Sequence, residues 1–311
     1  SVGTQFAILT FADYDDPKRR EDLITIAIDC WAEVAEHAKA AGLSYVFWEP
    51  MSVGREFGHT IAECMALQDR LTAADIERVV TDKSKLLIIN SPNNPSGAVI
   101  SPDEFEKIYA LTAAKGITLL TDECYCRLVY DSTPFSIASL EAAKPNVVVA
   151  GSLSKTYAMT GWRIGYTLGP KPLIGAINKL QSHSTSNPTS IAQKAAVEAL
   201  TGPQDSVQEM LGEYRRRRDY TVQALNDIPG VRCAMPGGAF YAYPNIGSFL
   251  GENGLGSGLA FVTGLLKEAH VAVVPGEAFG TTEHFRLSYA TSMHELERGI
   301  GRIREFVKEK S

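Results

Sequence analysis

Residues 151–166 of this chain read GSLSKTYAMTGWRIGY. Lys155 stands there next to the hydroxyl groups of Ser152 and Ser154, and Arg163 follows eight positions after the lysine. Hydroxyl groups and the forked guanidinium group are suitable hydrogen-bond donors to a phosphate. The pattern therefore predicts a lysine amine held beside a bound phosphate. The alternative interpretation is a serine-rich loop with a surface lysine.

Before this stretch, continuous apolar runs alternate with amphipathic patterns of helical spacing. Such an alternation predicts parallel strands that helices cover on both faces. The predicted strands are 86–89, 117–120 and 147–150, and the predicted helices are 72–80 and 102–115. Ligands of open α/β sheets bind at the carboxyl ends of the strands, so the loops 90–97, 122–125 and 152–155 are expected to meet there.

After residue 166 the pattern changes to longer helices and short strand-like segments. The predicted helices are 171–182, 188–201, 205–226, 258–269 and 293–309, and the predicted strands are 239–243, 271–274 and 285–289. We therefore predict an α/β fold with a mostly parallel sheet flanked by helices and a smaller C-terminal α+β domain. The predicted divisions are a βαβα segment at 1–71, a large-domain part at 72–205 and a small domain at 206–311.

Polar residues with possible chemical roles lie in or after these strands. Asp122 directly follows a buried strand, where its carboxylate could pair with a protonated ring nitrogen, although an aspartate at such a place also commonly caps a helix. Residues 91–97 read SPNNPSG, and their Asn-Pro and Ser-Gly pairs are also ordinary turn formers. Arg286 could fix a carboxylate with two parallel hydrogen bonds, whereas a lone arginine in a strand is more often part of an ion pair.

These segments together resemble the cofactor motifs of the class I/II aminotransferases, which are fold-type I enzymes that use pyridoxal 5'-phosphate (PLP). The resemblance covers residues 72–311. The segments follow the family order, which is SPNNPSG at 91–97, TDECY at 121–125, the lysine stretch at 151–166, PGGAFY at 236–241, VVPGEAFG at 273–280 and HFRLSYA at 284–290. The resemblance implies PLP as the cofactor.

The resemblance also implies a role for each candidate residue. Lys155 is expected to form the internal aldimine and then to shuttle a proton between the substrate Cα and the cofactor. Asp122 is expected to keep the pyridine nitrogen protonated, and Tyr125 and Asn94 to contact the ring hydroxyl. Arg286, together with Asn94, is expected to bind the substrate carboxylate. The expected phosphate ligands are Ser152, Ser154 and Arg163.

Residues 5–71 resemble a different family. Residues 45–58, YVFWEPMSVGREFG, are similar to a fragment of the sugar-phosphate isomerase/epimerase family, which has xylose-isomerase-like β/α barrels. That resemblance makes Glu49 a candidate metal ligand. Two strands cannot close a barrel or complete a ligand set, so Glu49 is better explained as a solvated strand-end residue, and we expect no metal site. We hypothesise that two family fragments join near residues 71–72, which makes the chain a chimera.

Composition narrows the remaining classes of function. The 311 residues carry a net charge of −6 with scattered lysine and arginine, so we expect no nucleic-acid partner and no binding to anionic membranes. The cluster Arg215–Arg218 is expected to lie on a solvated, ion-paired helix. No apolar run reaches the length of a membrane span. The five cysteines form an odd set without disulfide spacing, which favours a reducing, cytoplasmic location.

The expected function is PLP-dependent transfer of an amino group between an amino acid and a 2-oxo acid. These two small molecules are the expected partners, and the resemblance implies a homodimer. Three alternatives stay open: a truncated or chimeric scaffold that binds PLP weakly without catalysis, a PLP-dependent lyase, and a metal-dependent sugar isomerase. The motifs do not determine which amino acid is the substrate, because specificity lies in loops and arms outside them.

Overall fold

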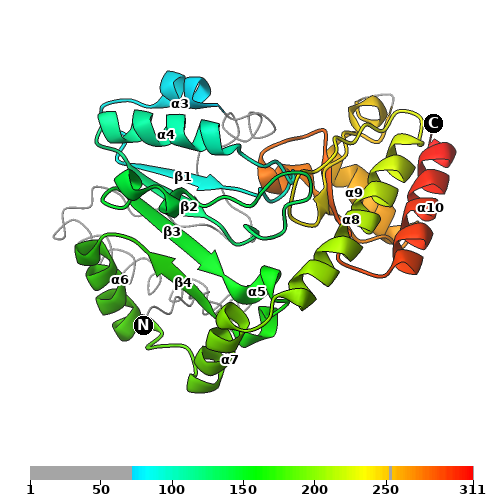
Figure 1. Cartoon of the computed structure of the whole chain (residues 1–311). Coiled ribbons are helices and arrows are strands. Elements are labelled where there is room, and N and C mark those ends of the chain that lie inside the picture. Colours follow the sequence, from blue (N-terminus) through cyan, green and yellow to red (C-terminus); the bar gives the residue numbers. More distant parts are fainter. Residues whose placement is uncertain (1–71, 252–253, 311) are drawn as a thin grey trace, which may run out of the picture.

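The computed structural model describes residues 72–251 and 254–310 (Figure 1). These residues form a sheet with helices on its sides and a second region of helices and short strands. In Figure 1 the long helix α8 (Asp205–Asn226) runs from the sheet region into the second region. The predictions for residues 1–71, including Glu49 and the barrel-like fragment, lie outside the described residues.

A four-stranded sheet in the order β1-β2-β3-β4 forms the first region. The strands are β1 (Leu86–Asn90), β2 (Thr118–Asp122), β3 (Val147–Ser152) and β4 (Gly165–Leu168). The first three are parallel and lie within two residues of the predicted strands, whereas β4 is antiparallel to β3 and was not predicted. β4 reads GYTL, which is not the continuous apolar run on which the parallel strands were predicted. The predicted α/β class is confirmed.

The register of the strands brings their carboxyl ends to one edge. Asn90 of β1 is paired with Asp122 of β2, and Asp122 is paired with Ala150 of β3, so β3 extends two residues further to Ser152. A glycine is needed at position 151, because a Cβ atom there would lie 2.3 Å from the ring of Tyr166 on β4. The sheet therefore presents the ends of three strands and the start of the lysine stretch together.

Helices α3 (Ala73–Val79) and α4 (Pro102–Ala114) cover one face of this sheet. Thr72 forms a capping box with Asp75 at the start of α3, and the Ser101 hydroxyl caps the Glu104 amide at the start of α4. The buried residues of this layer are Ile76, Phe105 and Ile108 on the helices and Ile89, Leu119, Val147 and Val149 on the strands. In Figure 1, α6 (Lys171–Ser184) and α7 (Ser190–Thr201) lie on the opposite side of the sheet.

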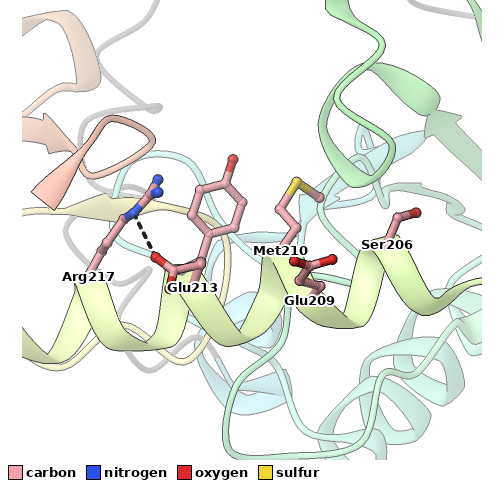
Figure 2. Close-up of a pocket in the computed structure, with 6 residues that line it drawn as sticks. Ser206, Glu209, Met210, Glu213 and Arg217 are labelled. Atoms are coloured by element: carbon pink, nitrogen blue, oxygen red, sulfur yellow. Dashed lines mark ion pairs between the residues drawn. The ribbon is translucent and has the colours of Figure 1, made fainter.

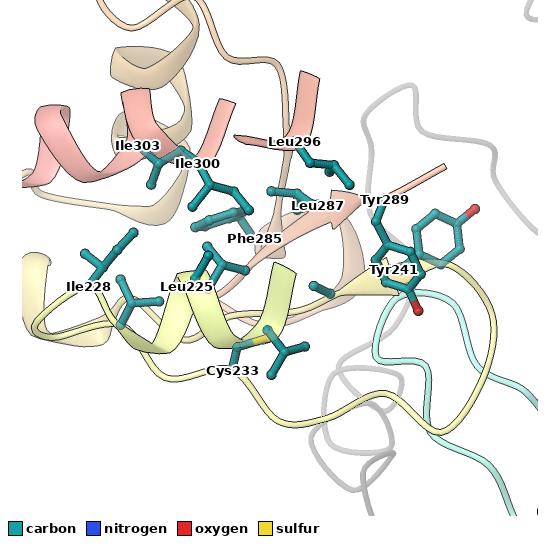
Figure 3. Close-up of a cluster of buried hydrophobic side chains, with 14 of the residues drawn as sticks. Leu225, Ile228, Cys233, Tyr241, Phe285, Leu287, Tyr289, Leu296, Ile300 and Ile303 are labelled. Carbon is teal, nitrogen blue, oxygen red and sulfur yellow. The ribbon is translucent and has the colours of Figure 1, made fainter. Parts of the chain in front are cut away.

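The second region combines helices α8, α9 (Gly258–Lys267) and α10 (Met293–Lys310) with an antiparallel sheet in the order β5-β7-β6. Its strands are β5 (Tyr241–Ala242), β6 (Val274–Pro275) and β7 (Phe285–Ser288). Figure 3 shows the core, where side chains of α8, β7 and α10 meet; the labelled members include Leu225, Ile228, Phe285, Leu287, Leu296, Ile300 and Ile303. The predicted strands 239–243 and 271–274 were too long or displaced, because β5 and β6 each pair with only two residues of β7.

Short helical turns connect the longer elements. They are α5 (Leu153–Thr156) and the 3₁₀ helices Ile137–Ser139, Glu141–Ala143, Thr160–Trp162, Gly247–Phe249 and Gly276–Phe279. α5 directly continues β3 and carries Lys155. A change from strand to a single helical turn therefore fixes the backbone around the lysine.

A buried cluster joins the two regions. Tyr125, Leu128 and Tyr130, which follow β2, pack into the same core cluster as the side chains of α8, β7 and α10. Arg218 of α8 bonds to Asp131 and to the Pro236 carbonyl and stacks on the ring of Tyr130. The predicted solvated helix is therefore wrong at Arg218, which is 5% exposed, because this carboxylate and this ring lie across from it. The domain division at 205/206 stays a prediction.

Candidate active site

The loop after β2 positions Asp122 and Tyr125. The Oδ1 atom of Asp122 accepts a hydrogen bond from the Cys124 amide at 3.0 Å, and residues 124–127 form a turn. The alternative that Asp122 caps a helix is therefore wrong. Tyr125 is buried within this turn, and its hydroxyl oxygen lies 2.9 Å from that of Tyr241.

The loop after β1 is tied to the end of β2 by Asn90. The side-chain oxygen of Asn90 accepts from the Asn94 amide at 2.8 Å, and its Nδ2 donates to the Asp122 carbonyl at 3.1 Å. Asn94 in turn accepts at Oδ1 from Nη1 of Arg286 at 2.7 Å. Asn94 of the first region and Arg286 of the second region, both predicted site residues, are thus in direct contact.

Arg286 lies on β7 with its guanidinium group between two aromatic rings. The guanidinium carbon is 4.6 Å from the ring centre of Tyr241 and 4.9 Å from that of Phe279. Within residues 72–251 and 254–310, Arg286 forms no ion pair with a carboxylate. The ion-pair alternative therefore has no support in this part of the chain. A guanidinium in such a setting can bind the carboxylate of a ligand.

The residues predicted to bind the phosphate are connected by hydrogen bonds within the segment 152–163. The Ser152 hydroxyl accepts from the Ser154 amide at 3.1 Å. Thr160 donates to the Ser154 carbonyl at 2.9 Å, and Arg163 donates to the Thr160 carbonyl at 3.1 Å. Arg163 is exposed and has a left-handed backbone with φ of 50°. The two serines and the arginine therefore lie on the same short segment as Lys155, from the end of β3 through α5 to the turn that precedes β4.

An aromatic group connects Lys155 to the carboxylate side. The Nζ atom of Lys155 is 5.9 Å from the ring centre of Phe240. The Phe240 ring contacts Tyr125 edge-on at 5.6 Å and lies 4.7 Å from Tyr241, as measured between ring centres. An unbroken series of contacts thus runs from Lys155 through Phe240 and the two tyrosines to Arg286.

Sequence reasoning missed three members of this site: Asn90, Phe240 and Tyr241. The segment PGGAFY was used only for its place in the order of motifs, although two aromatic residues after a glycine pair are a usable signal. Asn90 ends an apolar strand with a polar side chain, which was a second signal. Neither pattern reveals which distant residue the side chain meets, so their contacts were not predictable.

Burial sets the protonation of the side chains around Asp122. Burial raises the pKa of the Cys124 thiol to about 12, and the neighbouring Asp122 carboxylate adds to this rise. Burial, with a further contribution from Tyr241, raises the pKa of Tyr125 well above its ordinary value. Burial also raises the pKa of Glu123, although hydrogen bonds from two hydroxyl groups oppose it. Cys124 is therefore a protonated thiol at neutral pH and a poor nucleophile toward an aldehyde.

A groove along α8 adjoins the aromatic group. It has a volume of about 320 Å³ and is lined by Ser206, Glu209, Met210, Glu213, Tyr214 and Arg217. Figure 2 shows its labelled side chains on one side of the helix, with an ion pair of 3.5 Å between Arg217 and Glu213. The ring of Tyr214, which lines the groove, lies 5.4 Å from that of Phe240, as measured between ring centres. In the described part of the chain, no group of His, Cys, Asp and Glu side chains could hold a metal ion.

Known proteins show the same sequence pattern and fold. The sequence model of the family "Aminotransferase class I and II" matches residues 18–303. An aspartate aminotransferase from Bacillus sp. (strain YM-2) is 40% identical over 289 residues, which cover 92% of this chain and 70% of that protein. The crystal structure of the aspartate aminotransferase from Rhizobium meliloti superposes with a TM-score of 0.73 at 42% identity. That of the aromatic aminotransferase from Pyrococcus horikoshii OT3 superposes with a TM-score of 0.72 at 37% identity. The chain belongs to the class I and II aminotransferases, fold-type I enzymes that transfer amino groups with PLP.

The two solved structures are longer than the matched part of this chain. The match covers 78% of this chain and 62% of the Rhizobium meliloti chain, and 77% of this chain and 64% of the Pyrococcus horikoshii chain. The family match begins at residue 18, upstream of the predicted junction near residues 71–72. The junction and the isomerase-like fragment stay predictions. Among the described helices, none combines the length and the apolar character that crossing a membrane requires.

Proposed function

We propose that this chain transfers an amino group between an amino acid and a 2-oxo acid, with PLP held at the carboxyl edge of the sheet. The observation that carries the proposal is the series of contacts from Lys155 through Phe240 and Tyr241 to Arg286. This series supports the proposal because it connects a lysine amine to a guanidinium that has no carboxylate partner in the described part of the chain. When bound, PLP supplies the electron sink for the charge that develops at the substrate Cα.

The donor set at this edge fits PLP. The Asp122 carboxylate suits a protonated ring nitrogen, and the buried Tyr125 hydroxyl and the Asn94 amide suit the ring oxygen. The Ser152 and Ser154 hydroxyls and the Arg163 guanidinium suit the phosphate. Arg163 is exposed and, in the described part of the chain, has a carbonyl rather than a carboxylate as its partner, so its charge is available to an anion.

The side chains of this site then divide the work of the reaction. Arg286 and Asn94 hold the substrate carboxylate and thereby fix the direction of the Cα–H bond. The Lys155 amine removes the proton from the substrate Cα and delivers it to the cofactor carbon that is bonded to the substrate nitrogen. The Cys124 thiol stays protonated at neutral pH, so it does not compete with the Lys155 amine as a nucleophile. The names of the relatives make aspartate and aromatic amino acids the first substrates to test.

The decisive experiment asks whether PLP becomes attached to Lys155. The purified full chain is mixed with PLP, its visible absorbance is recorded, and the sample is reduced with borohydride and digested for peptide mass spectrometry. We expect a visible band and a reduced pyridoxyl group on the Lys155 peptide. The Lys155→Ala variant should lose both, and Lys179→Ala, on the distant helix α6, should keep both.

The products separate the remaining alternatives. With aspartate or phenylalanine, amino-group transfer yields the matching 2-oxo acid and the amine form of the cofactor in equal amounts. Elimination products in their place would show a lyase. Absence of the band in the unaltered chain would contradict the proposal and leave a scaffold that no longer holds its cofactor.

We propose a homodimer as the functional assembly. Helix α7 exposes several large apolar side chains; Ile191 is 72% exposed and Val197 is 57% exposed. Burying such side chains against a second copy would remove apolar surface from water. Light scattering should give the mass of two chains, and Val197→Asp should shift the mass toward one chain, whereas Lys194→Asp on the same helix should shift it less. A monomer at micromolar concentration would contradict the proposal.

A cytoplasmic location belongs to the same proposal. The three cysteines in the described part of the chain are free thiols, which suits a reducing compartment. Fractionation of the source cells should recover the chain with other cytoplasmic proteins, and recovery in a secreted fraction would contradict this location.

A further inference from the structure

Tyr241 lies between the two predicted binding groups of the site and uses a different part of its side chain for each. Its hydroxyl oxygen is 2.9 Å from the Tyr125 hydroxyl oxygen. The face of its ring lies against the Arg286 guanidinium, 4.6 Å from the guanidinium carbon. Tyr241 is 6% exposed and is held on β5, which pairs with β7, the strand that carries Arg286. Its position is therefore fixed relative to Arg286.

Tyr125 reaches the same place from the other region of the molecule. It follows β2, and its ring packs edge-on against both Phe240 and Tyr241 at centre distances of 5.6 and 5.8 Å. The hydroxyl contact is thus a side-chain hydrogen bond between the sheet region and β5. Packing alone would be served by a phenylalanine at position 241, so the hydroxyl group calls for a separate explanation.

We infer that Tyr241 is a positioning residue that couples the hydroxyl of Tyr125 to the guanidinium of Arg286, so that the cofactor side and the substrate side of the site are set together. The inference rests on the proposed function for the partners of Tyr125 and Arg286. Tyr241 acts on the reaction through these two side chains. Its hydroxyl supports Tyr125, and its ring supports Arg286.

The hydroxyl contact has a directional consequence. In the proposed function the hydroxyl proton of Tyr125 is donated to the cofactor ring oxygen, so the bond between the two hydroxyls, in which either oxygen could donate, must run from Tyr241 to the Tyr125 oxygen. That bond makes the Tyr125 hydroxyl a stronger donor, because hydrogen bonds in a chain polarise one another. A stronger donor at the cofactor ring oxygen reduces the negative charge there, and with it the proton affinity of the nitrogen that joins Lys155 to the cofactor. Losing the Tyr241 hydroxyl should therefore raise the pH midpoint of the visible band. The other titratable or charged groups near Tyr125 are Asp122 and Cys124, and those near Tyr241 are Arg286 and Cys124. Removing the Tyr241 hydroxyl leaves all of them in place.

The two contacts can be removed separately. Tyr241→Phe removes the hydroxyl and keeps the ring, whereas Tyr241→Leu removes both. Tyr243→Phe is the matched control, because it removes a hydroxyl two residues along the same segment, where the partner is Thr281. The first measurement is the pH midpoint of the visible band after addition of PLP. The second needs no cofactor and is the rate at which phenylglyoxal modifies Arg286 in the PLP-free chain, followed by peptide mass spectrometry.

We expect Tyr241→Phe to raise the pH midpoint by about 0.5–1 unit and to leave the modification rate of Arg286 within twofold of the unaltered chain. Tyr241→Leu should raise the midpoint similarly and speed the modification of Arg286 several-fold, because the guanidinium loses one of its two covering rings. Tyr243→Phe should change neither. An unchanged midpoint in Tyr241→Phe would overturn the cofactor half of the coupling, and an unchanged rate in a folded Tyr241→Leu variant would overturn the substrate half.

Failure of the proposed function gives a different pattern. The unaltered chain would then form no visible band, whatever residue stands at position 241. The phenylglyoxal rates would still decide whether Tyr241 positions Arg286. If Tyr241→Leu does not fold, as judged by circular dichroism, Tyr241→Phe still tests the hydroxyl contact through the pH midpoint.

Discussion

The two sides of the proposed site are built in different ways. On the phosphate side, the hydrogen bonds from Ser154 to Ser152, from Thr160 to Ser154 and from Arg163 to Thr160 each join residues at most six positions apart. On the carboxylate side, Arg286 contacts Asn94, which is 192 positions away in the sequence, and it stacks on Tyr241. The first side is local and partly exposed, whereas the second depends on the packing of two regions. Substitutions on the carboxylate side should therefore be less additive than those on the phosphate side.

Among substitutions on the carboxylate side and the phosphate side, we expect the largest effect on kinetics at Arg286. Arg286→Lys keeps the charge but loses the planar fork and the stacking between Tyr241 and Phe279. We expect KM for the amino acid to rise about 100-fold with a smaller change in PLP affinity, since a charge-assisted hydrogen-bond pair contributes roughly 3 kcal/mol. Steady-state kinetics and PLP titration measure the two quantities.

Arg304→Lys provides the control, because this arginine lies on α10 and contacts the Ala224 carbonyl. Its KM should match that of the unaltered chain. An Arg286→Lys variant with an unchanged KM would show that the substrate carboxylate binds elsewhere and not at Arg286.

A smaller effect is expected on the phosphate side. Arg163→Ala should weaken PLP binding about tenfold, because it removes charge-assisted hydrogen bonds to the phosphate from an exposed position. KM for the amino acid should stay within a few-fold. Fluorescence titration of the PLP-free chain measures the affinity, and Arg232→Ala in the second region serves as the control. A KM that rises as much as the PLP dissociation constant would show that the two sides are not separable.

The smallest effect concerns one of the contacts between the two regions, the ion pair of Arg218 with Asp131. The hydrogen bond from Arg218 lowers the pKa of Asp131, with Arg215 contributing. A lowered carboxyl pKa stabilises the fold above the unfolded pKa of about 4, and this stabilisation is lost as the pH falls through the folded value. Asp131→Asn should therefore lower the free energy of unfolding by about 1 kcal/mol at pH 7 and by less at pH 3.

Urea unfolding at the two pH values checks this prediction. The control is Glu141→Gln, whose partner Lys144 is three residues away on the surface, and it should change the free energy of unfolding by less than about 0.5 kcal/mol. If Asp131→Asn lowers the free energy of unfolding equally at pH 7 and pH 3, the ion pair of Asp131 with Arg218 is not the source of the stabilisation.

Sequence patterns predicted the elements whose signals are local. The three parallel strands and α8 were found because each is a continuous apolar or helical pattern, and α8 was predicted at 205–226, where the structure has it. The segments around Asn94, Asp122 and Lys155 were expected to meet because the carboxyl ends of parallel strands share an edge. The Rhizobium meliloti structure shares this fold.

Other features followed from contacts that a single pattern does not contain. The two-residue strand β5 exists only where β7 offers it a backbone partner in register. Arg218 is buried because Asp131 and Tyr130 come from a different part of the chain. Four consecutive arginines on a helix point in four directions, and the run does not show which of the four meets another element.

The family, the cofactor class and the segment that carries Lys155 follow from the sequence alone, because these depend on residue types at fixed spacing within short segments. Only the tertiary structure decided that Tyr241 lies between Tyr125 and Arg286. That arrangement depends on a strand pairing within one region and on side-chain packing between two regions. The physical reason is range: turn chemistry and apolar periodicity act over a few residues, whereas the contacts of a buried side chain depend on every element packed around it.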